Sequence, residues 1–208
     1  MRTLLKKLIP LLVLLVGTSA FAQFRIATID LNRVFTNYWK TKQAQVAIDE
    51  RRTDIEKTDK DMLATFNKAK GEYQKMLDSV NDPAVSSEEK DKRKKAAEDK
   101  LRDLKDQDEN IQQFERGSRS QLEDQYNRTR FNIVSDIRTA VSAKAKNDGY
   151  TLVIDTAAQT INATPVVLYS SPGDNDITEA IIKQINAGAP VDVPKTDEKP
   201  FSASPPKK

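Results

Sequence analysis

The sequence contains no cysteine and no histidine. Without these residues the usual zinc and copper sites, iron–sulfur clusters and haem sites with a histidine ligand are excluded. Without histidine, no side chain has an ordinary pKa close to neutral pH, so proton-transfer catalysis lacks its most common group. The chemistry that remains is limited to carboxylate metal sites and to serine, threonine, lysine, aspartate, glutamate or tyrosine.

Signatures of nucleotide chemistry and of catalysis are missing too. The sequence has no glycine-rich phosphate-binding loop, and no S-x-x-K motif stands in the context of a pocket. Its carboxylates fall mainly in segments expected to be exposed helices. Only six glycines occur in 208 residues, which disfavours a loop-rich fold. We therefore predict that the protein is not an enzyme and that it has no cofactor and no metal site.

Residues 1–22 have the pattern of a secretory signal peptide. Three basic residues stand in the first seven positions, a short apolar run follows over 8–16, and Ala20-Phe21-Ala22 supplies a small-residue cleavage site. The apolar run is far shorter than the roughly 20 residues that cross a bilayer as a helix. We expect cleavage before Gln23 and export of the remaining chain across the inner membrane.

Cleavage would change the charge of the protein. The removed segment holds three basic and no acidic residues, so the formal charge of +3 becomes zero, with 31 basic against 31 acidic residues. A mature chain without net positive charge is not expected to bind nucleic acid. The segment 90–95, with sequence KDKRKK, carries a local charge of +4. We consider two interpretations, a weak contact with an anionic membrane surface and an ordinary solvated helix face.

The proline distribution predicts a long helical hairpin over 40–148. Proline is absent from 23–82 and from 84–164, and the turn-forming sequence NDPA over 81–84 lies between these stretches. A capping box at Ser86 and Glu89 predicts that a second helix begins near Ser87. The hairpin tip is therefore expected near 81–86, and a stop signal at 147–149 ends the second helix.

Apolar residues of the two predicted helices match each other across this turn. If the chain folds back near residue 85, the numbers of facing residues add up to about 170. The expected pairs are Tyr73 with Ala97, Ala69 with Leu101, Phe66 with Leu104, Ile55 with Phe114, and Ile48 with Leu122. This agreement predicts an antiparallel coiled coil. Its apolar seam is narrow and is interrupted by charged residues, which makes a two-helix arm marginal on its own.

The segments 23–39 and 149–187 flank the hairpin and form the expected body. Residues 24–31, 150–155 and 166–169 have strand character, and a last helix begins at 176–179 with a capping box. Three strands and one short helix cannot cover their own hydrophobic faces, which predicts a closed homo-oligomer that also hides the strand edges. The residues expected at its interface are Ile26, Ile29, Leu152, Val153 and Ile154.

The C-terminal residues 188–208 hold five of the nine prolines and lack apolar periodicity. This composition predicts a disordered, partly polyproline-like tail. We interpret it as an inert solubilising segment, with docking of a partner as the alternative.

Several of these features, taken in their order along the chain, resemble the pattern of a known protein family. They are the signal peptide, the strand RIATID over 25–30 followed by Val34-Phe35, the long charged hairpin, the strand LVID over 152–155 and the helix opened by 176–178. Together they resemble the Skp/OmpH-like periplasmic chaperone family. The resemblance implies an α+β fold: a homotrimer with a small β-barrel body formed between subunits and a coiled-coil hairpin inserted in each subunit as an arm.

The resemblance also implies a function. Members of this family hold unfolded outer-membrane proteins in a cavity between the arms without ATP and prevent aggregation on the way to the outer membrane. The residues that suit this role are apolar side chains diluted among charges on the arm. They are Met62, Phe66, Tyr73, Met76 and Phe114. The hairpin interior is the competing place for the same side chains.

The neutral mature chain departs from the strongly basic character that the resemblance implies, so electrostatic capture of clients is not expected. A coiled-coil spacer or adaptor of the cell envelope, which binds one specific partner, is the alternative function.

Overall fold

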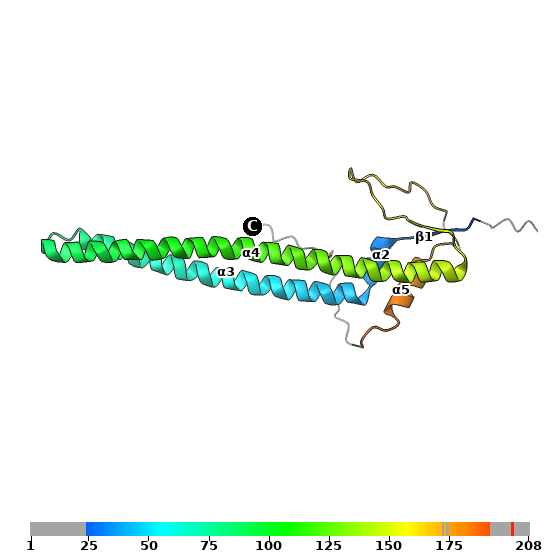
Figure 1. Ribbon diagram of the computed structural model, residues 1–208, viewed down its shortest axis with the longest axis horizontal. Helices are drawn as coiled ribbons and strands as arrows, with labels where there is room; N and C mark the ends of the chain where they lie inside the picture. Colours follow the sequence, from blue (N-terminus) through cyan, green and yellow to red (C-terminus); the bar gives the residue numbers. More distant parts are fainter. Residues whose placement is uncertain (1–23, 172, 174, 192–200, 202–208) are drawn as a thin grey trace, which may run out of the picture. The chain divides into compact units, whose positions relative to one another are not determined.

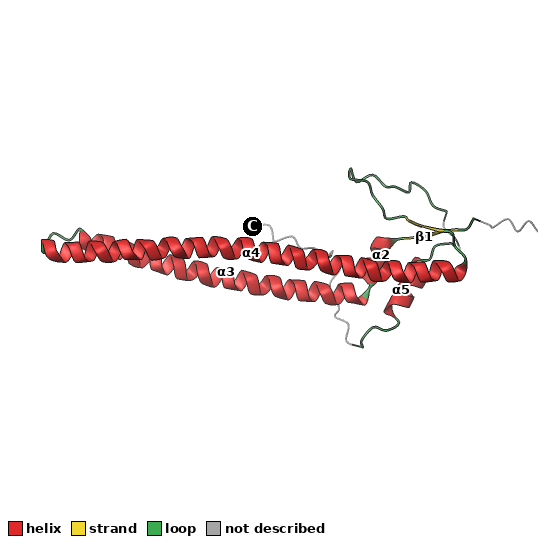
Figure 2. Ribbon diagram, in the orientation of Figure 1, coloured by secondary structure: helices red, strands yellow, loops and turns green. Residues whose placement is uncertain are grey.

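Figure 1 shows the computed structural model, which describes residues 24–171, 173, 175–191 and 201. The predicted signal peptide and most of the predicted tail lie outside these residues. Contact clustering divides the chain into two compact units. The sheet unit comprises the described residues of Met1–Leu31 and Val141–Thr178, and the hairpin unit those of Asn32–Ala140 and Glu179–Lys208. The fold is mainly helical with one small sheet, as Figure 2 shows.

Two long helices form the hairpin unit, as the proline distribution predicts. Helix α3 spans Trp39–Val80, and helix α4 spans Ser87–Asp148 and continues into the sheet unit. The two helices run side by side in opposite directions (Figures 1 and 2). Helix α3 ends just before the predicted tip at 81–86, and α4 begins at the predicted Ser87 and ends within the predicted stop signal at 147–149.

The turn at the hairpin tip is held by short polar side chains. The backbone N–H of Ala84 donates to the carboxylate of Asp82 at 2.9 Å, and the N–H of Glu89 donates to the hydroxyl of Ser86 at 3.4 Å. The carboxylate of Glu89 pairs with Arg93 at 3.2 Å. Ser86 therefore caps the helix as predicted, whereas Glu89, which a capping box would turn back to the helix start, pairs with Arg93 one turn further along.

Contacts between α3 and α4 confirm the antiparallel register. Near the tip, Arg93 donates to the backbone oxygen of Ser79 at 3.0 Å, and Lys100 lies 2.7 Å from Glu72. The numbers of each pair add up to 172, against the predicted 170. The difference of two residues is within the reach of lysine and arginine side chains. The predicted fold-back near residue 85 is correct.

The apolar seam of the hairpin is narrow. On α4 the residues Ala97, Leu104, Ile111 and Ser118 recur every seven positions, and each is at most 7% exposed. Leu101 was predicted in the seam but is 37% exposed. A heptad position is therefore not sufficient to bury Leu101.

Two short helices complete the hairpin unit at the start of α3. They are α2, Leu31–Asn37, and α5, Thr178–Asn186. The side-chain oxygen of Asn186 accepts from the N–H of Trp39 at 2.9 Å, and its amide donates to the backbone of Asn37 at 3.0 Å. Asn186 thus supplies the cap that Tyr38, at the N-cap position, does not make with its own side chain. This contact ties α5 to the first turn of α3.

The sheet unit is built on two parallel strands. Strand β1 spans Ile26–Ile29, and strand β2 spans Leu152–Asp155, with Ile26 opposite Leu152 and Ile29 opposite Asp155. The carboxylate of Asp155 then accepts from the N–H of Leu31 at 3.0 Å, which fixes the start of α2. Residues 126 positions apart in the sequence are therefore paired in one sheet, as predicted for a body interrupted by an inserted hairpin.

Helix α4 ends at the predicted glycine. Gly149 has a φ of +73°, a conformation that glycine adopts without a steric penalty. The N–H of Tyr150 donates to Ala145 at 2.8 Å and that of Gly149 to Lys146 at 3.4 Å, which is the Schellman pattern. The side chain of Arg25 donates to the backbone of Asp148 at 2.6 Å, so the same turn is tied to the residue before β1.

The third predicted strand, 166–169, does not form. In its place residues 158–166 make an irregular loop in which Val166 donates to Ala158 at 2.8 Å and Thr160 donates to Thr164 at 2.8 Å. A strand needs backbone partners on a neighbouring chain segment, and within the described residues none is offered to 167–169. The side of β1 away from β2 is occupied by a single bridge from Thr28 to Asp176.

Candidate functional site

The described residues contain no group of three or more carboxylates that could hold a metal ion. Over the same residues, no helix has both the length and the apolar character needed to cross a membrane. The candidate functional regions are instead two apolar surfaces, one in each unit.

The first surface lies on the sheet. Ile26 is 37% exposed and Leu152 is 44% exposed, and the two residues are register partners, so their side chains lie on the same face of the sheet. On the opposite face Ala27 and Ile29 are buried at 0% and 4% exposure. One face of the sheet is therefore covered by the chain itself, and the other presents aliphatic side chains.

The loop that follows β2 holds further exposed apolar side chains. The side chains involved are Ile161, Val166, Leu168 and Tyr169, which are 59% exposed or more. Isolated exposed apolar residues are common in proteins, but several such side chains on one small unit mark an interaction surface. We call Ile26, Leu152 and these four residues the sheet surface. The loop residues were not predicted as interface residues, although the strand pattern over 166–169 without an available partner is a signal for them.

The predicted interface residues occupy different positions within the sheet unit. Ile26 and Leu152 are exposed, and Val153 and Ile154 are half-buried. Ile29 is already buried by the fold of its own chain. The sheet therefore offers Ile26 and Leu152 most directly to a second polypeptide.

The second surface lies on the arm. Of the predicted client-facing residues, Met76 is 36% exposed, while Met62, Phe66, Tyr73 and Phe114 are half-buried beside the seam. Three further apolar side chains of the arm are exposed. They are Leu63 at 39%, Leu101 at 37% and Phe131 at 73% exposure. Leu63 and Phe131 fall outside the heptad stripe that forms the seam. Their position outside this stripe indicates that their side chains are exposed.

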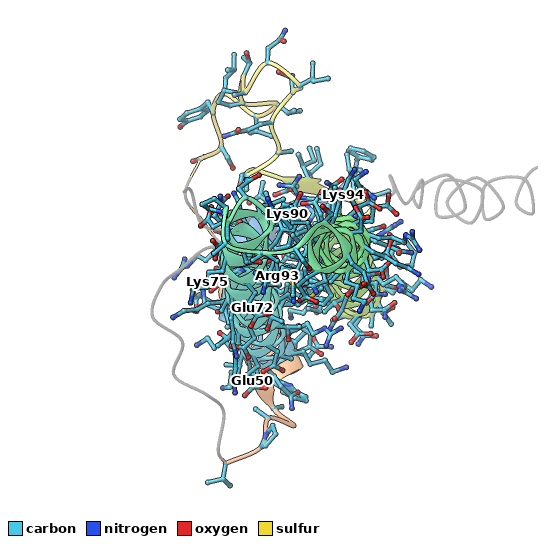
Figure 3. The ribbon with its side chains drawn as sticks, turned by 90° about the vertical axis from the view of Figure 1, so that its left-hand side faces the viewer. Glu50, Glu72, Lys75, Lys90, Arg93 and Lys94 are labelled. Atoms are coloured by element: carbon cyan, nitrogen blue, oxygen red, sulfur yellow. The ribbon has the colours of Figure 1, made fainter. Side chains whose placement is uncertain are left out.

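Charged side chains surround the arm. Figure 3 views the hairpin from its tip and shows Arg93 between the two helices, where it contacts Ser79 and Glu89. Lys92 pairs with Glu88 at 3.3 Å. The basic segment 90–95 is thus partly neutralised by the acidic residues that begin α4. Surface ion pairs of this kind add little stability, but they keep apolar arm residues apart and limit self-association.

One ion pair joins the two helices of the hairpin. The ammonium of Lys100 binds the carboxylate of Glu72 at 2.7 Å and lowers the pKa of Glu72 below its ordinary value of 4.5. Because this pKa is lowered in the folded state, the pair stabilises the fold above about pH 4.5. That stabilisation is lost as the pH falls through the folded-state pKa.

We expect Lys100→Met to raise the pKa of Glu72 back towards 4.5, because the hydrogen bond to Lys100 is the largest cause of the shift. The measurement is an NMR titration of the Glu72 side-chain carboxyl. Lys75→Met is the matched control, since Lys75 is the smallest contributor to the shift and should change the pKa less. A larger effect of Lys75→Met than of Lys100→Met would contradict the observed pairing.

Fold and surfaces together define a class of protein. A long antiparallel hairpin with diluted apolar side chains, joined to a small sheet with one exposed apolar face, is suited to contacts with other polypeptides. The sequence matches the family model described as outer membrane protein, OmpH-like, over residues 25–185. This match runs from the residue before β1 into α5, and the chain belongs to the OmpH-like family. The family is one of periplasmic, non-enzymatic chaperones of outer-membrane proteins. No curated protein matches the chain.

Proposed function

We propose that this protein is an ATP-independent periplasmic holdase. It binds unfolded outer-membrane proteins in a cavity between helical arms and prevents their aggregation during transit to the outer membrane. The observation that carries this proposal is the presence of two exposed apolar surfaces in one chain. One suits permanent contacts between copies, and the other suits weak contacts with varied clients. Family membership supports the same function.

The sheet surface is the proposed site of assembly. A two-stranded sheet with one aliphatic face open to solvent is not a self-sufficient core. Association of several copies, as a homotrimer with a β-barrel between subunits, would bury Ile26 and Leu152 and give partners to residues 166–169. Val153 and Ile154 belong to the same proposed interface. Ile29 would support it from within its own subunit, because its side chain is already buried.

The arm is the proposed site of client binding. Met62, Phe66, Tyr73, Met76 and Phe114 contribute together with the exposed Leu63 and Phe131. Transmembrane β-strands of client proteins alternate apolar and polar side chains, so they offer evenly spaced small apolar contacts. Each contact with the arm would be weak, and retention would come from many contacts within one enclosed space. The basic segment 90–95 adds a weak contact with anionic membrane surfaces near the tip.

An aggregation assay tests this function. Two unrelated outer-membrane β-barrel proteins are diluted from urea with and without the mature protein, and light scattering is followed. We expect scattering to be suppressed for both clients without ATP, at about one assembly per client. A spacer or adaptor specific for one partner would suppress neither.

The arm surface is tested in the same assay. The double substitution Met76→Gln and Phe131→Gln removes two exposed apolar side chains without touching the buried seam, so the helices should remain intact. We expect suppression to weaken several-fold. Val191→Gln, at a fully exposed position outside the arm, is the matched control and should change nothing. Equal activity of the double variant and the control would argue against the arm as the binding surface.

A further inference from the structure

Phe201 packs against two aromatic residues of the hairpin unit. Its ring stacks on Tyr126 of α4, with ring centroids 4.6 Å apart and an angle of 22° between the planes. It meets the ring of Phe35 of α2 edge-on, with centroids 5.6 Å apart and an angle of 68°. The hydroxyl of Tyr126 also donates to the backbone oxygen of Phe201 at 3.2 Å. Three residues far apart in the sequence thus form one aromatic cluster.

The contacts recognise general features of a peptide. Stacking and edge-on packing are the two preferred geometries of aromatic pairs, and Tyr126 and Phe35 together contact one aromatic ring in these two ways. The hydroxyl of Tyr126 binds a backbone carbonyl oxygen, which every residue has. Nothing in these contacts depends on the sequence around Phe201. All three side chains are only half-buried, so the cluster is open at the surface.

We propose that Phe35 and Tyr126 form a binding site for an aromatic residue of an unfolded polypeptide. Phe201 occupies this site in the resting chain, and an aromatic residue of the client displaces it. This inference rests on the function proposed above and names one place where a client is held. It also revises the interpretation of the C-terminal segment as inert, because one of its residues competes for the client's site.

The chemistry of the clients fits this site. Outer-membrane barrels carry girdles of aromatic residues at both membrane interfaces. An unfolded client therefore offers many aromatic side chains on an extended backbone. Phe201 belongs to the same chain as the site, so it competes at a high local concentration. It therefore weakens the binding of a client that makes only one aromatic contact. A client with several contacts still displaces it.

The first experiment compares peptide binding by the full mature chain and its Phe201→Ala variant. The probe is a fluorescently labelled, unstructured peptide with the alternating pattern of a transmembrane strand and a single phenylalanine. A second peptide carries leucine in place of that phenylalanine. The apparent Kd equals the intrinsic Kd divided by the fraction of time that the site is free of the competitor. We expect Phe201→Ala to lower the Kd of the phenylalanine peptide about two- to tenfold, as suits one aromatic pair.

Two comparisons assign the effect to this site. Val191→Ala removes another exposed apolar side chain from the C-terminal region and should leave the Kd unchanged. Tyr126→Phe keeps the ring but removes the hydroxyl donor, while Tyr126→Leu removes the ring. In the Tyr126→Leu background, Phe201→Ala should bring no further gain, because the contested site is gone. Helical content measured by circular dichroism verifies that each variant is folded.

The outcomes separate this inference from the proposed function. An unchanged or higher Kd for Phe201→Ala overturns the inference, as does an equal gain for the leucine peptide. If the chain suppresses aggregation of outer-membrane proteins while Phe201→Ala has no effect on peptide binding, only the inference fails. If no form of the protein binds either peptide or suppresses aggregation, both fail.

Discussion

Leu152→Asp should dissociate the proposed assembly into single chains and abolish its holding activity. Leu152 is 44% exposed and lies beside Ile26 on the open face of the sheet. In the proposed assembly this face is buried, so each copy would lose about 2 kcal/mol of apolar burial and would also bring an unpaired carboxylate into the interface. Because every subunit carries the change, the penalty is repeated around the ring. We expect no assembly at micromolar concentration.

Light scattering coupled to size-exclusion chromatography measures this result. The unsubstituted protein should have about three times the mass of one mature chain, and Leu152→Asp should have the mass of one chain. Leu63→Asp is the matched control, because Leu63 is 39% exposed and lies on the arm. It should leave the mass unchanged. An unchanged mass for Leu152→Asp would disprove assembly through the sheet surface.

Ile48→Ala should lower the free energy of unfolding by about 2–4 kcal/mol, which is the usual cost of removing a fully buried isoleucine side chain. Ile48 is 1% exposed on α3. Ile55, one heptad further along the helix, is only half-buried. Ile55→Ala should therefore cost no more than about half as much, although both residues stand at the same heptad position.

Urea unfolding followed by circular dichroism at 222 nm compares the two variants. All samples need the same protein concentration, because assembly makes the apparent stability depend on concentration. Equal losses at both positions would show that the seam is packed evenly along the arm. That result would contradict the conclusion that the seam is narrow and interrupted.

Heptad spacing predicted the hairpin well but did not predict which seam residues are exposed. Both helices, their ends and the antiparallel register follow from local signals. Leu101 is 37% exposed although it stands in the predicted seam, because burial depends on the side chains that the facing helix brings near it.

The strand pattern was less reliable, for a different reason. Residues 26–29 and 152–155 become strands because each supplies the backbone partner of the other. Residues 166–169 have similar composition but no such partner within the described chain. Their extended pattern leaves exposed side chains in a loop, which turns a predicted structural element into part of a candidate interface.

The sequence by itself determined the hairpin turn and where α4 begins and ends. The turn at Asp82-Pro83, the cap at Ser86 and the positive φ of Gly149 are set by residues within a few positions of one another, so local chemistry suffices. Tertiary structure alone decided which apolar side chains remain exposed and placed Phe201 on Tyr126. These outcomes depend on contacts between distant residues, because burial is a property of the neighbours that folding brings together.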